Sequence, residues 1–287
     1  MFTLYIGNKN YSSWSLRPWL AMRHFDIPFR ESRVALYQAD SASKLRAVSP
    51  SGKVPVLRDG ELVVWDSLAI GEYLAERYPE FGLWPGNARQ RALARAVSAE
   101  MHSGFTALRS QMPMNLRASL PGCGHTPEVL ADIARITEIW ASLRAQHAAH
   151  GDFLFGPFCY ADAMFAPVVT RLATYGVALD GVVADYAAAV LTLPAMVEWR
   201  EAALAEAPRD HPAEVAGGEG LAEIVVGAAA HGIDGALEGG VAGHQNDDDV
   251  GVGFAQSAQQ REAVDVGEHE VNDRGREVLA GKDAQGL

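Results

Sequence analysis

Cysteine is scarce in this sequence: Cys123 and Cys159 are the only two among 287 residues. Two distant cysteines cannot form a disulfide framework, and without a Cys-x-x-Cys pair the chain lacks that dithiol redox chemistry. There is also no apolar run of about 18 residues, and the N-terminus begins with a strand-like pattern, not with a basic segment and an apolar core. We therefore expect an unexported, soluble, cytoplasmic protein that does not associate with membranes.

Basic charge is not in excess anywhere. Residues 1–212 contain 21 acidic and 20 basic side chains, whereas residues 213–287 contain 15 acidic and 4 basic ones. Without a clustered surplus of Lys and Arg, the first part gives no support to nucleic-acid binding. The tail, residues 213–287, holds 15 of the 28 glycines and no helical periodicity, which predicts an acidic, low-complexity, disordered segment. One interpretation is a wrong-frame translation without function.

Residues 1–82 alternate between strand and helix patterns and predict a compact α/β domain. The expected order is strand, helix, strand, helix, β-hairpin and helix, with the pieces near residues 2–7, 14–25, 29–36, 41–48, 54–65 and 66–78. Residues 83–88 read as a linker. Residues 89–212 show helical patterns only, at 89–117, 127–150, 161–174 and 194–207. The sequence thus predicts an α/β domain, an all-helical domain and a tail.

Two short motifs in the first domain could meet a ligand. Pro55 stands at the start of an apolar strand, and a cis bond after Val54 would let the Val54 backbone pair with a ligand as an added strand would. On the dipeptide alone, an ordinary trans proline is the more frequent outcome. Asp66 and Ser67 lie at a predicted helix N-terminus, which attracts a carboxylate, while Asp66 could hold an ammonium group. A simple N-cap is the alternative.

A hydroxyl-rich loop joins the first strand to the first helix and contains Ser12, Ser13 and Ser15. A serine hydroxyl that donates to a thiolate at a helix N-terminus stabilises the charged form and lowers the thiol pKa from about 8.5. Capping of the helix is the other role such hydroxyls serve. Histidines offer little, because His147 and His150 have no evident third partner, and we expect no metal site.

Together, these features resemble the cytosolic glutathione S-transferase family over residues 1 to about 210. The segment Ser12–Arg17 is similar to the Ser-Ser-Cys-Ser-x-Arg signature of the serine-type zeta class, with Trp14 in place of the cysteine. The segment 156–163 resembles the family's folding motif, but Cys159 replaces the Ser or Thr that caps the helix. We therefore expect a weakened capping box, in which Asp162 can still reach backbone donors.

The resemblance implies a thioredoxin-like N-terminal domain and an all-α C-terminal domain. It implies that Ser12 activates the glutathione thiol, with Ser13 and Ser15 as alternates, and that glutathione is a co-substrate with no other cofactor. The implied glutathione contacts are Lys53, Val54, Asp66 and Ser67. The implied pocket for a small hydrophobic electrophile is lined by Met101, Phe105, Met112 and Met114, which plain core packing would explain equally well.

The function implied by the resemblance is transfer of glutathione to a small electrophile by a homodimer, as in detoxification. A glutathione-dependent isomerase of the maleylacetoacetate type, or a dehalogenase, is the alternative within enzymes, although Trp14 departs from the zeta signature. A non-catalytic relative that binds protein partners is the alternative outside enzymes. Such relatives often lose the activating hydroxyl or the acidic residue and serine at the third helix, and this chain retains both.

Overall fold

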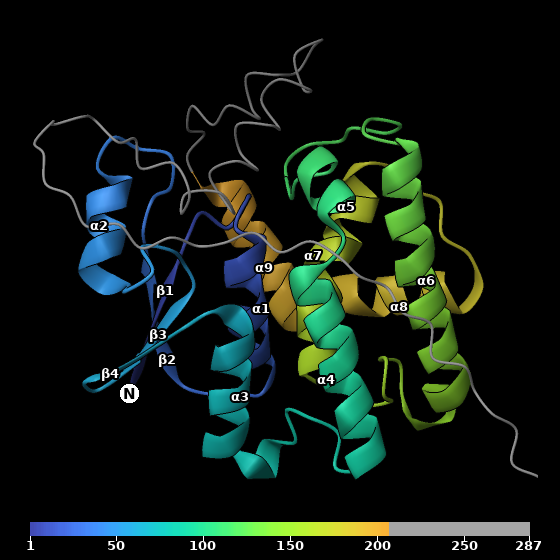
Figure 1. The fold of residues 1–287 in the computed structure, drawn as a ribbon, viewed down its shortest axis with the longest axis horizontal. Helices are drawn as coiled ribbons and strands as arrows, with labels where there is room; N and C mark the ends of the chain where they lie inside the picture. The colour runs from blue at the N-terminus through green and yellow to red at the C-terminus, as the bar shows by residue number, and fades with distance from the viewer. Residues whose placement is uncertain (207–287) are drawn as a thin grey trace, which may run out of the picture. The chain divides into compact units, whose positions relative to one another are not determined.

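The computed structural model describes residues 1–206 (Figure 1). The expected tail, residues 213–287, lies outside the described residues, as does the end of the last predicted helix. Within the described part, the N-terminal third contains all the strands, and the remainder is helical. The predicted fold class, a thioredoxin-like domain followed by a helical domain, is confirmed. The boundaries of the linker at 83–88 stay a prediction.

The sheet has four strands in the order β2-β1-β3-β4. Strand β1 pairs in parallel with β2 and antiparallel with β3, and β3 forms a hairpin with β4. Gly60, with φ of +57°, permits the tight turn of that hairpin. The strands are β1 (Phe2–Ile6), β2 (Phe29–Arg33), β3 (Val56–Asp59) and β4 (Leu62–Trp65). The helices between them are α1 (Ser13–His24), α2 (Ser41–Val48) and α3 (Ser67–Arg77).

The helical domain differs from the expectation at two places. The helix expected over 89–117 is broken at Gly104 and Phe105, where Phe105 has φ of +58°. The helix over Gly181–Thr192 was not expected, because its sequence is almost uniformly apolar and shows no clear stripe. The elements are η1 (Pro79–Phe81), α4 (Ala88–Ser103), α5 (Thr106–Gln111), α6 (Pro127–His147), η2 (Ala148–His150), α7 (Tyr160–Thr174), α8 (Gly181–Thr192) and α9 (Pro194–Ala205).

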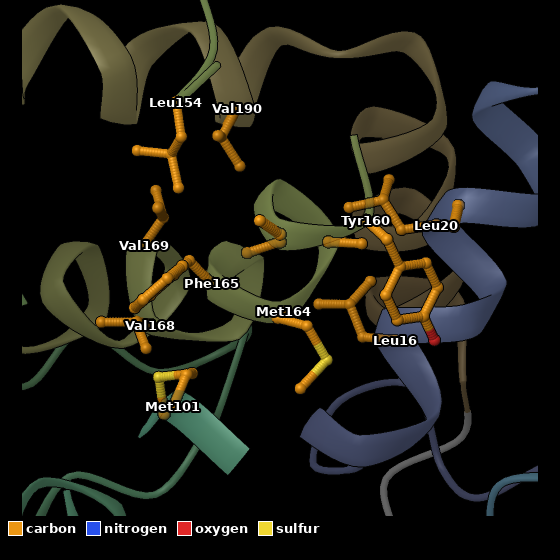
Figure 2. Packing of buried hydrophobic residues seen from close by; sticks show 14 of the residues in the cluster. Leu16, Leu20, Met101, Leu154, Tyr160, Met164, Phe165, Val168, Val169 and Val190 are labelled. Atoms are coloured by element: carbon orange, nitrogen blue, oxygen red, sulfur yellow. The ribbon is translucent and has the colours of Figure 1, made fainter. Parts of the chain in front are cut away.

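Helix α1 joins the two domains. In Figure 1 the sheet lies to its left and helices α4 to α8 to its right, and α1 packs on both α7 and α9. Figure 2 shows Leu16 and Leu20 of α1 beside Tyr160 of α7, and all three side chains are buried. Because α7 is buried along nearly its whole length, it forms the centre of the core. The first turn of α1, which begins at Ser13, is therefore held in place by contacts with both domains.

In the described part of the chain, no single helix is long and apolar enough to cross a membrane. The bent pair α8 and α9 passes that test by length and composition.

Candidate active site

Three serines surround the start of α1. Ser12 precedes the helix, and its Oγ donates a hydrogen bond to Ser15 Oγ at 2.7 Å. Ser15 Oγ also accepts the backbone N–H of Gly7 at 3.0 Å, so Ser15 connects the end of β1 to the first turn of α1. Ser12 and Ser13 are buried, and Ser15 is completely so. Ser12 is thus held at the positive end of the helix dipole by a hydroxyl beneath it.

Trp14, which stands where the zeta signature has cysteine, lies among basic side chains. The Arg17 guanidinium is 4.2 Å from the centre of the Trp14 ring, and the Arg109 guanidinium is 5.5 Å from it. The His102 ring meets the Trp14 ring edge-on, with 5.1 Å between their centres. The indole therefore presents its π-electrons to two cations from different domains.

Two buried arginines, Arg17 and Arg171, form a cationic cluster with the half-buried Arg109. Arg17 is 1% exposed and Arg171 is 4% exposed. Burial, together with neighbouring arginines, lowers the pKa of Arg17 to about 9 and that of Arg171 to about 10. Nε of Arg17 and Nε and Nη1 of Arg171 have no hydrogen-bond partner among the described residues. Desolvated donors of one charge favour a bound anion.

Asp66 and Ser67, at the start of α3, lie beside the same group of side chains around Trp14 and Arg17. Asp66 has φ of +74° and caps α3 by accepting the N–H of Leu68 at 2.8 Å. Its other oxygen lies 3.2 Å from His102 Nε2. Partial burial opposes its ionisation, but these hydrogen bonds outweigh that effect and hold the pKa of Asp66 below its usual value. A non-glycine residue with positive φ is a strained conformation, which is often found at ligand sites.

Ser67 lies beneath Asp66 and is almost fully buried. Its Oγ accepts a long hydrogen bond of 3.5 Å from Arg17 Nη1, and its carbonyl oxygen accepts the Tyr160 hydroxyl from α7. Arg17 therefore connects the start of α1 to the start of α3, while His102 touches both Trp14 and Asp66. Two helix N-termini meet at one place.

The remaining expected contacts lie near the hairpin. The peptide bond between Val54 and Pro55 is cis, which is the less frequent of the two outcomes that the dipeptide alone allowed. The Lys53 side chain is exposed, and its backbone N–H donates to Ser49 Oγ at 3.2 Å. The roles of Lys53 and Val54 toward glutathione stay predictions.

The four residues expected to line an electrophile pocket lie in the hydrophobic core. They are Met101, Phe105, Met112 and Met114, with exposures of 0–7%. This placement is what the alternative of plain core packing expects, and the pocket role stays a prediction. For the described residues, no group of three or more His, Cys, Asp or Glu side chains could hold a metal ion.

His102, Arg109 and Arg171 were not identified from the sequence as site residues. His102 and Arg109 come from the region expected to be one continuous helix, and the break at Gly104 and Phe105 changes where they point. Arg171 did carry a signal, because it is the only basic residue of α7 and stands in an otherwise apolar stretch after Asp162. A charged residue at a core position is usually paired or functional.

Comparison with known proteins gives the same picture. A family model described as the N-terminal domain of glutathione S-transferase matches residues 11–77. The maleylacetoacetate isomerase of Pseudomonas aeruginosa is 30% identical over 204 residues, which cover 65% of this chain and 91% of that protein. A probable maleylacetoacetate isomerase of Caenorhabditis elegans is 34% identical over 113 residues, 39% of this chain and 52% of that protein. In the first curated relatives, the chain spans about half of their length.

Solved structures share the fold. A glutathione transferase homologue from Burkholderia, with bound glutathione, superposes with a TM-score of 0.56 at 24% identity, covering 71% of this chain and 99% of that one. A maleyl pyruvate isomerase, described as a bacterial zeta-class glutathione S-transferase, gives a TM-score of 0.56 at 22% identity, covering 72% and 100%. Fold and site define a thioredoxin-like protein with an appended helical domain. The chain belongs to the glutathione S-transferase family.

Proposed function

We propose that this protein binds glutathione, stabilises its thiolate with the Ser12 hydroxyl and adds it to a small electrophile. The observation that carries the proposal is the meeting of the α1 and α3 N-termini, joined by Arg17 and His102. One N-terminus suits a thiolate, and the other suits the α-carboxylate of a γ-glutamyl group, whose ammonium Asp66 would hold. Lys53, Val54 and Ser67 are proposed as further glutathione contacts.

The chemistry needs little beyond positioning. The thiol gives its proton to solvent, and the Ser12 hydroxyl turns its hydrogen from Ser15 Oγ to the sulfur. This hydrogen bond and the α1 dipole stabilise the resulting thiolate. The sulfur then forms a bond to the electrophilic carbon while a leaving group departs, or while a double bond accepts the electron pair. Binding of both reactants in one site supplies the orientation. We propose a cytoplasmic homodimer, as the family resemblance implies.

The test of this function is binding of glutathione by the whole chain, measured by calorimetry and by thiolate absorbance against pH. Cysteinylglycine, which lacks the γ-glutamyl group, is the matched ligand. Glutathione should bind with a thiol pKa clearly below its free value, and cysteinylglycine should bind far more weakly. A chain that binds neither ligand would instead support a partner-binding relative without catalysis.

Asp66→Asn should weaken glutathione binding about tenfold, because the amide retains the cap to Leu68 but loses the charge that would face the ammonium group. Calorimetry at pH 7 measures the change. Asp40→Asn is the control, since Asp40 also precedes a helix, α2, and is exposed. Equal losses in the two variants would argue against a γ-glutamyl contact at Asp66.

The arginine cluster favours a second possibility, a glutathione-dependent isomerase whose acceptor carries a carboxylate. Arg17 and Arg171 have buried donors without a partner among the described residues, and Arg17 and Arg109 lie over the Trp14 ring. An anionic acceptor would satisfy the unpaired donors. In such a reaction the thiolate adds to a double bond, rotation follows about the resulting single bond, and the thiolate leaves. Two relatives are named maleylacetoacetate isomerase or probable maleylacetoacetate isomerase, and that substrate is a dicarboxylate.

Arg171→Met should raise the KM for an acidic acceptor about tenfold and leave a neutral acceptor nearly unchanged, since it removes charge while keeping an apolar stem in the core. Maleylacetone and 1-chloro-2,4-dinitrobenzene are suitable acceptors of the two kinds. Arg135→Met is the control, because Arg135 is exposed and already paired with Glu100 and Glu138. A parallel loss for both acceptors would contradict the anion site.

A further inference from the structure

The loop that carries Ser12 is held by the helical domain. Asn10 is 1% exposed and makes three hydrogen bonds across more than 100 residues of sequence. Its Nδ2 donates to Asn115 Oδ1 at 3.0 Å, its Oδ1 accepts the N–H of Arg117 at 3.0 Å, and its carbonyl oxygen accepts the N–H of Leu116 at 3.4 Å. An amide is the side chain that can donate and accept in this way at one position.

The partner segment is itself fixed. Asn115 Oδ1 also accepts the N–H groups of Arg117 at 3.2 Å and Ala118 at 3.3 Å. The Asn115 carbonyl oxygen accepts Thr174 Oγ1 at 2.9 Å, which ties it to the last residue of α7. The Arg117 guanidinium donates to the Ala203 carbonyl oxygen in α9 at 3.2 Å. Asn115 is therefore a firm point of attachment for Asn10.

Lys9, next to Asn10, is anchored by the same domain. Its N–H donates to Glu206 Oε1 at 2.9 Å, and its carbonyl oxygen accepts Trp199 Nε1 at 3.0 Å. Its ammonium group pairs with Glu31 at 2.9 Å above the Trp199 ring. These contacts hold the backbone before Asn10, so the side chain of Asn10 controls the stretch that follows.

That stretch leads directly to the activating hydroxyl. Only Tyr11 separates Asn10 from Ser12, and the N–H groups of Tyr11 and Ser12 both donate to the Asn8 carbonyl oxygen, at 3.2 and 2.8 Å. The turn is therefore compact, and a shift of Asn10 moves the end of the turn. Small displacements of a catalytic group cost a large part of its effect.

We propose that Asn10 is a positioning residue, which with Asn115 fixes the Ser12 hydroxyl against the glutathione sulfur. The proposal rests on the proposed function, because it requires that Ser12 meets a thiolate. It makes thiol activation dependent on the helical domain through the Asn10–Asn115 hydrogen bond.

The test measures the thiol pKa of bound glutathione in the whole chain. Asn10→Asp keeps the acceptor for Arg117 but turns an oxygen toward Asn115 Oδ1, so it should move the thiol pKa much of the way back to about 8.5 and lower kcat about tenfold. Asn115→Leu removes the acceptor of the Asn10–Asn115 hydrogen bond and should raise the thiol pKa and lower kcat to a similar extent. This second variant tests the proposal if Asn10→Asp does not fold. Asn115→Asp retains the oxygen that accepts the Asn10 Nδ2 hydrogen bond, so this single variant should keep the wild-type thiol pKa.

Two further variants separate positioning from mere stability. Asn87→Ala removes the cap of α4, which destabilises the chain without removing a hydrogen bond of the Ser12 loop, and it should leave the thiol pKa unchanged. In a Ser12→Ala background, Asn10→Asp should add nothing to the thiol pKa, because it acts through Ser12.

The outcomes are distinct. An unchanged thiol pKa in both Asn10→Asp and Asn115→Leu overturns the inference alone, and so does an additive effect with Ser12→Ala. A wild type that does not bind glutathione overturns the proposed function and this inference together.

Discussion

Ser12→Ala should raise the thiol pKa of bound glutathione toward about 8.5 and reduce kcat/KM at pH 6.5 by roughly 30- to 150-fold. A hydrogen bond to a charged group contributes about 2–3 kcal/mol, and the variant removes the one that we assign to the thiolate. Affinity for glutathione should change little, because the γ-glutamyl contacts remain. Thiolate absorbance against pH and steady-state kinetics measure the two effects.

The neighbouring serines provide the matched controls. Ser13→Ala should leave the thiol pKa nearly unchanged. Ser15→Ala should have an intermediate effect, because it removes the hydroxyl whose hydrogen bond with Ser12 Oγ holds Ser12 in place. If Ser13→Ala instead gives the large loss, the activating role moves to Ser13. Because the loss arises from the thiolate fraction, it should shrink as the pH rises above the thiol pKa.

Asp162→Ala should reduce the free energy of unfolding by about 4 kcal/mol. The Asp162 carboxylate is fully buried and accepts the N–H groups of Leu154 at 3.0 Å and of Cys159 at 2.8 Å. Each buried donor left without an acceptor costs about 1–3 kcal/mol. Urea unfolding of the whole chain, followed by tryptophan fluorescence, measures the loss. Asp180→Ala is the control, because Asp180 precedes α8 without a side-chain cap and should change stability by less than about 0.5 kcal/mol.

Asp162→Asn gives this prediction a pH dependence. Burial raises the pKa of Asp162 from 3.8 to about 6, although the hydrogen bonds from Leu154 and Cys159 oppose the shift. The folded chain therefore keeps the proton to higher pH than the unfolded chain does. Relative to the amide variant, the wild type should lose stability as the pH rises from about 4 to about 6, by at most about 3 kcal/mol, and no further above that. A wild type that gains stability relative to the amide variant over this pH range would contradict a raised pKa.

Much of the N-terminal domain follows from local sequence signals. The helix predicted over 41–48 has those bounds in the structure, and the hairpin follows from apolar strands on either side of Gly60. Asp162 reaches the Cys159 N–H as the folding motif implied, although cysteine replaces the usual hydroxyl residue. In each case, the residues that decide the structure are close together in sequence.

The features that sequence did not predict depend on distant contacts. The break at Gly104 and Phe105 is stabilised by tertiary packing, because both Met101 before it and Leu108 after it are buried in the core. The arginine cluster is assembled from α1, α5 and α7, and no local pattern relates Arg17 to Arg171. Burial decides which of several basic residues become unpaired, and burial is a property of the whole fold.

The contact between Gly71 and Tyr160 has a consequence for the way such a protein can change during evolution. A β-carbon at position 71 would lie 2.3 Å from the Tyr160 ring, and the Tyr160 hydroxyl reaches the backbone of Ser67 in the same helix as Gly71. Tyr160 comes from the helical domain, so each domain carries half of a fitted pair. A domain taken from another family member must therefore bring a residue at position 71 or 160 that fits the one retained in the other domain.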